Sequence, residues 1–260
     1  MNRRRLLQIA AASIPFLPNV WSWLFGPRLS VPATRSLSRI RPADSDWPSE
    51  ASWDRLSQKI RGKLVKVQSR LAECVEAPTS ASCAQIFKEL KNPYYLGDEV
   101  ALTQSLGWVG AWTSRPSSYA VAAETTDDVV AAVNFARENN LRLVVKGGGH
   151  SYQGTSNAAD SLLIWTRRMN AITLHDAFVG SGCAGWQAPQ EAVTVEPGAI
   201  WGQVYDAVTT KGGRYVQGGG CMTVGVAGLI QSGVLAASRR PTGWLQGACW
   251  KPRSSLPMAK

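Results

Sequence analysis

The chain has 260 residues, enough for one large domain or two small ones. Hydrophobic residues make up 45% and aromatic residues 8%, which excludes wholesale disorder, and five cysteines are too few for a disulfide-dense miniature scaffold. The formal net charge of +10 comes from the two ends, since residues 1–41 carry seven arginines, residues 234–260 carry five basic residues, and neither segment has an acidic one. Residues 42–233 hold 16 basic and 18 acidic residues, which removes the support for a nucleic-acid partner.

Residues 1–33 have the pattern of an export signal. Arg3, Arg4 and Arg5 precede an apolar stretch that continues to Leu17. The segment 2–8 resembles the twin-arginine signal, so we expect the twin-arginine export machinery as a partner and a periplasmic or extracellular location. The alternative is a retained membrane anchor, but prolines interrupt the run of about 20 apolar residues that a spanning helix requires, so we expect no stable membrane span.

Residues 34–100 are predicted to form a linker followed by a helical segment. Pro, Ser and Arg are frequent up to Trp47, and apolar residues recur at helical spacing afterwards, which predicts one amphipathic helix over residues 50–75. Cys74 and Cys83 flank a turn-forming stretch. In an oxidising compartment they would form a disulfide, whereas in the cytosol they would stay free core thiols.

From about Leu102 the pattern changes to alternating strands and helices. Strands are predicted at 119–122 and 141–145, with a helix between them that begins at Thr125 or Thr126 and ends at Asn139. This order is typical of a parallel sheet with a right-handed crossover. Further strands are expected at 161–165 and 192–195, followed by a helix over 200–210.

A glycine-rich loop follows the second of these strands. Gly147, Gly148 and Gly149 would let main-chain amides approach an anion such as a pyrophosphate, with Lys146 supplying a cation, and His150 and Ser151 come next. Taken alone, such a loop is more often a structural turn than a binding site.

Two further segments give the loop a context. One contains Glu196-Pro197-Gly198, and the other contains Gly220-Cys221-Met222-Thr223-Val224-Gly225. In this order and spacing the motifs resemble the FAD-linked oxidases of the berberine-bridge-enzyme type, within the vanillyl-alcohol-oxidase superfamily. The resemblance covers Leu102 to Ser232. It implies an α/β (α+β) fold over 101–233, the PCMH-type FAD-binding domain with a small parallel sheet and flanking helices, preceded by the helical segment.

The resemblance also implies a cofactor and its attachment. FAD would be bonded through His150 to the flavin 8α-methyl group and, in members with two links, through Cys221 to flavin C6. Imidazole and thiolate are suitable nucleophiles for this chemistry; the alternative for Cys221 is a small buried hydrophobe. The pyrophosphate loop would comprise Lys146, Gly147, Gly148, Gly149 and Ser151, and the second loop Thr223, Val224, Gly225 and Gly228. His175 and Cys183 match nothing in the family and are expected in a polar surface loop.

The implied activity is oxidation of an alcohol or sugar, a small-molecule substrate, with the electrons passed to oxygen. After Gly233 the resemblance stops, and residues 234–260 have neither periodicity nor the character of a sheet element. Permitted codons for 234–244, read from their third base, give FGSFSKTYGLA, which matches the family's continuation, so we expect an out-of-frame tail. No catalytic base is predicted, and the alternative function is a truncated, non-catalytic fragment that binds flavin at most.

Overall fold

The computed structural model describes residues 38–104, 110, 113–181, 185 and 188–232, and the main chain of 255–259. The predicted export signal and Cys183 lie outside these residues. The chain divides into two units, Met1–Ser38 and Arg39–Lys260, and the described helices and strands belong to the second. Within the described part, no helix has the length and apolar character needed to cross a bilayer.

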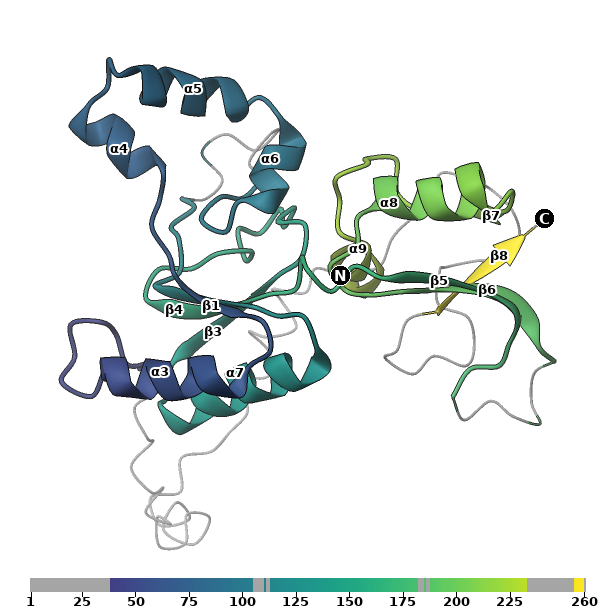
Figure 1. Cartoon of the computed structure of the whole chain (residues 1–260), viewed down its shortest axis with the longest axis horizontal. Helices are drawn as coiled ribbons and strands as arrows, with labels where there is room; N and C mark the ends of the chain where they lie inside the picture. The colour runs from purple at the N-terminus through teal and green to yellow at the C-terminus, as the bar shows by residue number, and fades with distance from the viewer. Residues whose placement is uncertain are drawn as a thin grey trace, which may run out of the picture. The chain divides into compact units, whose positions relative to one another are not determined.

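The first sheet contains four strands in the order β1-β2-β4-β3 (Figure 1). They are β1 (Lys63–Lys66), β2 (Tyr119–Ala122), β3 (Arg142–Lys146) and β4 (Ser161–Trp165). Both β2 and β3 run parallel to β4, and β1 is antiparallel to β2. The predicted strand–helix–strand unit is confirmed as β2, α7 (Thr126–Glu138) and β3, but β4 lies between its two strands.

Helices α3 (Glu50–Lys59) and α7 pack together against one face of this sheet (Figure 1). The core there includes Trp53, whose ring stacks on Tyr119 with 3.9 Å between centroids. The start of α7 is fixed by a capping box between Thr125 and Asp128. The opposite face buries a smaller cluster around Leu163.

The prediction of one helix over 50–75 is wrong. Helix α3 ends at Lys59, strand β1 follows, and a separate helix, α4 (Leu71–Glu76), begins after it. Leu64 faces Val121 in the β1–β2 ladder, so the apolar residues at helical spacing are divided between a helix and a strand. Residues 63–66 form a strand because they pair with a segment more than fifty positions away, and the local periodicity of the sequence does not show this pairing.

Helices α4, α5 (Ala81–Glu89) and α6 (Pro93–Asp98) follow β1. A disulfide between Cys74 and Cys83, with Cα atoms 5.0 Å apart, joins α4 to α5. The hydroxyl of Ser80 accepts from the Cys83 amide and so caps α5. The predicted pairing of the two cysteines is therefore confirmed.

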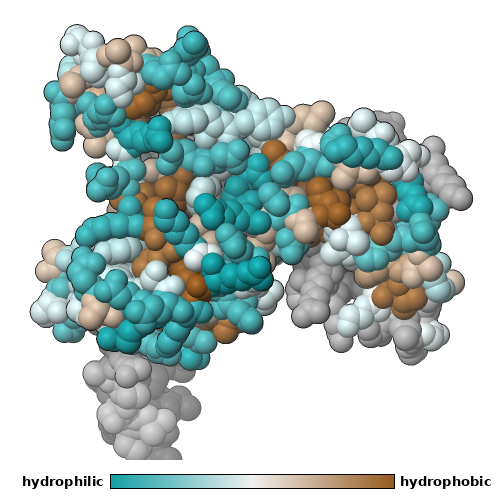
Figure 2. Space-filling view, viewed as in Figure 1, coloured by the Kyte–Doolittle hydropathy of each residue, from teal (hydrophilic) through white to brown (hydrophobic). Residues whose placement is uncertain are grey.

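The second sheet has the order β5-β6-β8-β7. Its strands are β5 (Ile172–Phe178), β6 (Gln190–Val195), β7 (Tyr215–Val216) and β8 (Ser255–Ala259). Helix α8 (Trp201–Tyr205) continues into a π-helical turn, Asp206–Lys211, and α9 (Val226–Ser232) completes the core around Trp201. Apolar surface is visible between α8 and the β5–β6 ribbon (Figure 2).

Two expectations about this region are wrong. His175 lies within β5, half-buried, and not in a surface loop, because β5 pairs with β6 from Ile172 to His175, and again at Phe178 after a register shift, despite its mixed polar pattern. Residues 255–259 form β8, which pairs with both β6 and β7 although the tail was expected to lack sheet character. Ladder bonds use main-chain groups, so such pairing needs no side-chain periodicity.

Candidate functional site

Two glycine-rich loops meet without side chains between them. The first, residues 147–151, follows β3, and the second, residues 217–225, leads into α9. A β-carbon on Gly148 would lie 2.7 Å from Gly225 N, and one on Gly225 would lie 2.8 Å from Gly148 N. Real β-carbon contacts are longer than this, so both positions require glycine for the loops to stay in contact.

The Glu-Pro-Gly turn holds the two loops from a third side. A β-carbon on Gly147 would lie 3.1 Å from Pro197 O, and Gly198 sits directly on the main chain of Thr166. From the helix that follows, Trp201 N donates to Val224 O at 3.1 Å. The three motifs that the sequence singles out therefore lie together in space.

The first loop presents unused main-chain donors. Gly148 and Gly149 are buried, and Gly149 has φ +76°, a conformation that favours glycine. The amides of Gly148, Gly149 and His150 donate to no acceptor among the residues that the structure describes. Buried amides without partners are rare, and several together form a cradle for an anion.

A histidine, a threonine and a cysteine converge beside this cradle. His150 Nε2 and Thr223 Oγ1 are 3.0 Å apart, and Cys221 Sγ lies 3.6 Å from the same hydroxyl. Burial lowers the pKa of His150, against a smaller opposing effect of a hydrogen bond to the main chain of Thr223. At neutral pH the imidazole is therefore uncharged and keeps a lone pair, and Cys221 is an exposed free thiol.

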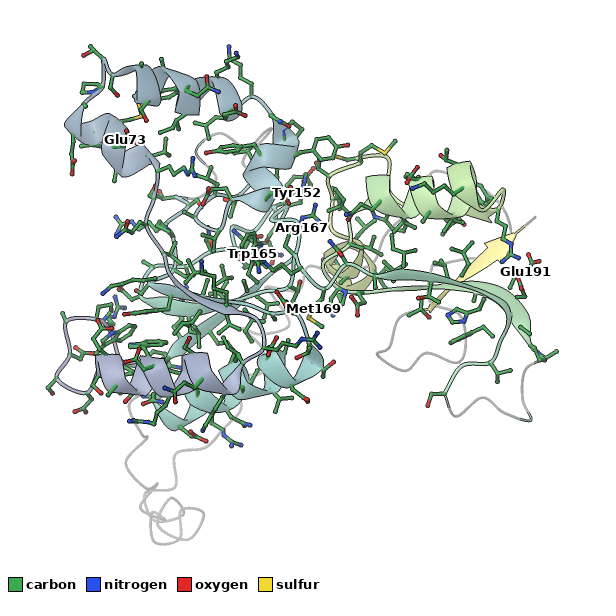
Figure 3. All side chains as sticks on the ribbon, viewed as in Figure 1. Glu73, Tyr152, Trp165, Arg167, Met169 and Glu191 are labelled. Carbon is green, nitrogen blue, oxygen red and sulfur yellow. A yellow bond between two sulfur atoms is a disulfide. The ribbon has the colours of Figure 1, made fainter. Side chains whose placement is uncertain are left out.

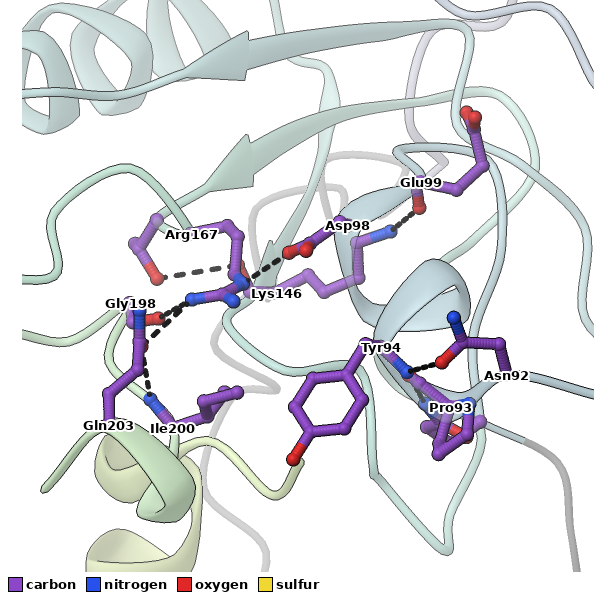
Figure 4. A network of polar contacts seen from close by, with 12 residues as sticks. Asn92, Pro93, Tyr94, Asp98, Glu99, Lys146, Arg167, Gly198, Ile200 and Gln203 are labelled. Atoms are coloured by element: carbon purple, nitrogen blue, oxygen red, sulfur yellow. Dashed lines mark hydrogen bonds and ion pairs between the residues drawn. The ribbon is translucent and has the colours of Figure 1, made fainter. Parts of the chain in front are cut away.

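Lys146 does not supply the expected cation. Its side chain is buried, and Nζ donates to three main-chain carbonyls, those of Glu99 (3.2 Å), Val100 (2.6 Å) and Leu102 (2.9 Å) (Figure 4). The ammonium group has three hydrogens, so none remains for a phosphate. Lys146 instead fixes the segment that runs under the glycine loop, where Gln104 N donates to Gly149 O at 3.0 Å.

Three other predicted site residues contact the protein's own loop or core, or have nothing near the β-carbon position. Ser151 Oγ accepts from the amides of Gln153 and Thr155 and so closes its own turn. Val224 packs against the core around Trp201. Gly228 lies on the exposed side of α9 with nothing within 4 Å of a β-carbon position, so no close approach requires glycine there.

Arg167 is a structural residue of the site that the sequence reasoning missed. It lies just after β4 and makes three bonds: Nε to Asp98 Oδ1 at 2.6 Å, and NH1 to Gly198 O at 3.0 Å and to Gln203 Oε1 at 3.2 Å (Figures 3 and 4). It thereby ties the end of α6 to the Glu-Pro-Gly turn and to α8. An arginine pair after a buried strand is the only signal in the sequence, and it does not tell which arginine points inward.

Fold and site together define a protein of the flavin-nucleotide-binding class: a small parallel sheet, a glycine loop with buried free amides, and a histidine and a cysteine beside it. The profile of the family described as FAD binding domain matches residues 117–251, more than half of the chain. The chain therefore belongs to the FAD-binding-domain family of FAD-linked oxidoreductases, as its motifs predict.

Relatives and solved structures agree with this assignment. The FAD-linked oxidoreductase notD of Aspergillus sp. (strain MF297-2) is 30% identical over 92% of this chain and 41% of its own length. The FAD-linked oxidoreductase malF of Malbranchea aurantiaca is 33% identical over 76% of this chain and 37% of its own. The crystal structure of the VAO-type flavoprotein MtVAO615 from Myceliophthora thermophila C1 is 25% identical, with TM-score 0.63 over 76% of this chain and 38% of that one. The chain thus spans about two fifths of the length of these relatives.

The residues present fit FAD. The cofactor carries a pyrophosphate, and the unpartnered amides of the first loop are suitable donors for it. Asn157 Oδ1, on the loop after His150, is a buried acceptor without a partner among the described residues, while its Nδ2 donates to Ala101 O. Within the same described ranges, no group of His, Cys, Asp and Glu residues is arranged to hold a metal ion.

Proposed function

We propose that the protein carries FAD covalently, through His150 and through Cys221 as a second link. The observation that carries the proposal is the meeting of His150 Nε2 and Cys221 Sγ at one hydroxyl, that of Thr223, at 3.0 and 3.6 Å. Both side chains stand on loops that contact each other through glycine main chains. Two nucleophiles so placed can engage one ring system from two loops.

Each residue has a separate task in this proposal. The amides of Gly148, Gly149 and His150 hold the pyrophosphate. The uncharged imidazole of His150 keeps the lone pair that a covalent bond requires, since burial holds its pKa below the usual value. When bound, the flavin supplies hydride acceptance from a substrate and electron delivery to oxygen.

The overall reaction that we propose is oxidation of a small alcohol or sugar, based on the resemblance in the motifs. The alternative function is a fragment that binds flavin without turnover. We assign no catalytic base. Among the described residues, no carboxylate is bonded to the side chains of His150, Thr223 or Cys221. The phenol of Tyr205, which contacts the second loop, donates its hydrogen to Gly219 O at 2.7 Å.

Acid precipitation of the purified full chain tests the covalent link. We expect a yellow, fluorescent pellet for the wild type, loss of the histidyl link in His150→Ala, and the histidyl link alone in Cys221→Ala. His175→Ala is the matched control, because the other histidine of the chain lies on β5 and should leave attachment unchanged. A colourless wild-type pellet, or acid-stable flavin that persists unchanged in His150→Ala, would contradict the proposal.

Turnover distinguishes the two functions. A yellow protein that is bleached by candidate alcohols or sugars under nitrogen, and regains colour with oxygen, is an oxidase. One that is never bleached is the flavin-binding fragment.

We also propose that residues 1–33 direct export through the twin-arginine machinery. The Cys74–Cys83 disulfide supports this, since such bonds persist in oxidising compartments. Cell fractionation of the wild type and of a variant with Arg3→Lys and Arg4→Lys tests it: we expect the variant alone to stay inside the cell. Equal export of both would exclude this route, and retention of the wild type in the membrane would favour the anchor.

A further inference from the structure

Thr223 stands between the two candidate attachment residues. Its side chain is 4% exposed, so water competes little for its hydroxyl. On one side lies His150 Nε2 at 3.0 Å, and on the other lies Cys221 Sγ at 3.6 Å. A hydroxyl group has one hydrogen to donate, so it can donate to only one of these neighbours at a time.

The single hydrogen favours two arrangements, because the sulfur is a weak acceptor as a thiol and a stronger one as a thiolate. In the first, the hydroxyl donates to Nε2, the imidazole hydrogen is on Nδ1, and the Cys221 thiol donates to the hydroxyl oxygen. In the second, Nε2–H donates to the hydroxyl oxygen, the hydroxyl donates to a thiolate, and Nδ1 has the lone pair. A third arrangement, in which Nε2–H donates to the hydroxyl oxygen and the hydroxyl donates to a neutral thiol, uses only the weaker bond to sulfur.

We infer that Thr223 is a positioning residue that couples the tautomer of His150 to the ionisation of Cys221. When the thiol releases its proton to solvent, the hydroxyl hydrogen turns from Nε2 to Sγ, and the imidazole hydrogen is relocated from Nδ1 to Nε2 by exchange with water. One proton leaves the group in total. The imidazole lone pair at Nδ1 and the thiolate thus become available in the same state.

This inference rests on the proposed function for its purpose, but its test does not require flavin. Three titratable side chains lie against these segments: Lys146, whose Cδ lies 3.5 Å from a β-carbon position on Gly149; Tyr94, whose hydroxyl lies 3.6 Å from that on Gly202; and Tyr205, whose hydroxyl donates to Gly219 O. None of them is changed by a substitution at Thr223, so comparison of variants at the same pH isolates the hydroxyl.

The chain contains its own control. It has two histidines, and His175 Nε2 lies 2.9 Å from Thr194 Oγ1, a second histidine–threonine pair on the ladder between β5 and β6. Nitrogen NMR of the ¹⁵N-histidine-labelled full chain, prepared free of flavin, therefore gives two imidazoles, one expected to respond and one not.

For the wild type we expect the His150 imidazole to change from the Nδ1–H to the Nε2–H tautomer as the pH is raised until the thiol ionises. Thr223→Val, of similar shape, and Cys221→Ala should each abolish this change, whereas Thr223→Ser should keep it. His175 should be the same in all four proteins. Absence of the change in the wild type, or its persistence in Thr223→Val or Cys221→Ala, would overturn the inference. Because Cys221→Ala leaves Thr223 in place, a folding defect of one variant does not remove the test.

Thiol alkylation gives a second readout. In Thr223→Val we expect iodoacetamide to modify Cys221 about threefold to tenfold more slowly, the value of one hydrogen bond to the thiolate, with recovery in Thr223→Ser. Peptide mass analysis separates Cys221 from Cys183 and Cys249, whose rates serve as internal references. Equal rates in the wild type and Thr223→Val would contradict the coupling. A colourless acid pellet from the wild type would instead contradict covalent attachment, and would leave these two measurements to decide the role of Thr223.

Discussion

Gly148 and Gly225 touch through their main chains: the β-carbon absent from Gly148 would lie 2.7 Å from Gly225 N and 2.9 Å from Thr223 O. The same contact holds Thr223 beside His150. The two glycines therefore set the spacing of the two candidate attachment residues, although neither glycine can react.

Gly148→Ala tests this relationship. The added methyl group must push the second loop away, so we expect a loss of about 1–3 kcal/mol in the free energy of unfolding and a clear loss of bound flavin. Chemical denaturation and the flavin-to-protein absorbance ratio measure the two effects. Gly228→Ala is the control, since nothing lies within 4 Å of its β-carbon position and alanine favours a helix by up to about 1 kcal/mol. Flavin content at the wild-type level in Gly148→Ala would contradict the argument.

Elements with strong local signals could be predicted from the sequence. Strand β4 matches its predicted bounds, and α7 has the expected cap at Thr125, because a continuous apolar run and a capping box are both local features. Strands β1 and β5 could not be predicted, since each is short or mixed in polarity and forms by pairing with a distant partner. Main-chain pairing of this kind leaves little trace in the pattern of one strand.

The motifs predicted one site from separate segments of the sequence, and the structure brings the two glycine loops and His150 together. This part could be predicted because such loops need glycine at fixed positions. For Lys146 the sequence did hold a signal: Val144 and Lys146 are two apart on β3, so both point to the same buried face. The contacts of Arg167 depend on segments 31 to 69 positions away, which no local pattern records.

Arg167→Lys should destabilise the junction of α6, the Glu-Pro-Gly turn and α8. Lysine keeps the charge but lacks the planar fork that reaches Asp98 and Gly198 O together. Because these bonds involve a charged group with 13% side-chain exposure, we expect a loss of about 1.5–3 kcal/mol in unfolding free energy. Arg168→Lys is the matched control: its pair with Glu124 is 50% and 38% exposed, so we expect a change of at most about 1 kcal/mol. Equal effects of the two substitutions in urea denaturation would show that the Arg167 contacts carry no stability.

Asp128→Asn should destabilise the start of α7 and its junction with β1. Burial pushes the pKa of Asp128 up, but hydrogen bonds from the amides of Glu124, Arg61, Thr125 and Gly62 outweigh it and hold the pKa below its usual value. The carboxylate therefore contributes stability above the unfolded pKa of about 4, and this is lost as the pH falls through the lower folded value.

At neutral pH we expect Asp128→Asn to cost about 1.5–3 kcal/mol, measured by chemical denaturation, with a smaller difference from the wild type in acid. Asp127→Asn, on the exposed neighbour in the same turn, is the control and should change the unfolding free energy by less than about 1 kcal/mol. A difference for Asp128→Asn that stays constant into acid would show that the carboxylate's ionisation is not the source of its effect.

Lys146 predicts an opposite dependence on pH. Burial lowers the pKa of Lys146 from 10.5 to about 7, against a smaller raising effect of Glu99. Between these two values the unfolded chain binds a proton that the folded chain does not, so the contribution of Lys146 to stability rises with pH across this range and is constant below it. Lys146→Met removes the titration while keeping a similar length of side chain.

We expect the unfolding free energy of the wild type minus that of Lys146→Met to increase between about pH 7 and about pH 9, by at most about 1.4 kcal/mol per unit. Denaturation of both proteins at several pH values gives this difference, in which the titrations common to both cancel. The three carbonyls that accept from Nζ oppose the trend, because they favour the charged amine. A flat or falling difference would therefore mean that these carbonyls keep Lys146 charged, with its pKa well above 7, and that the ammonium group ties the segment 99–102 to the glycine loop throughout the physiological range.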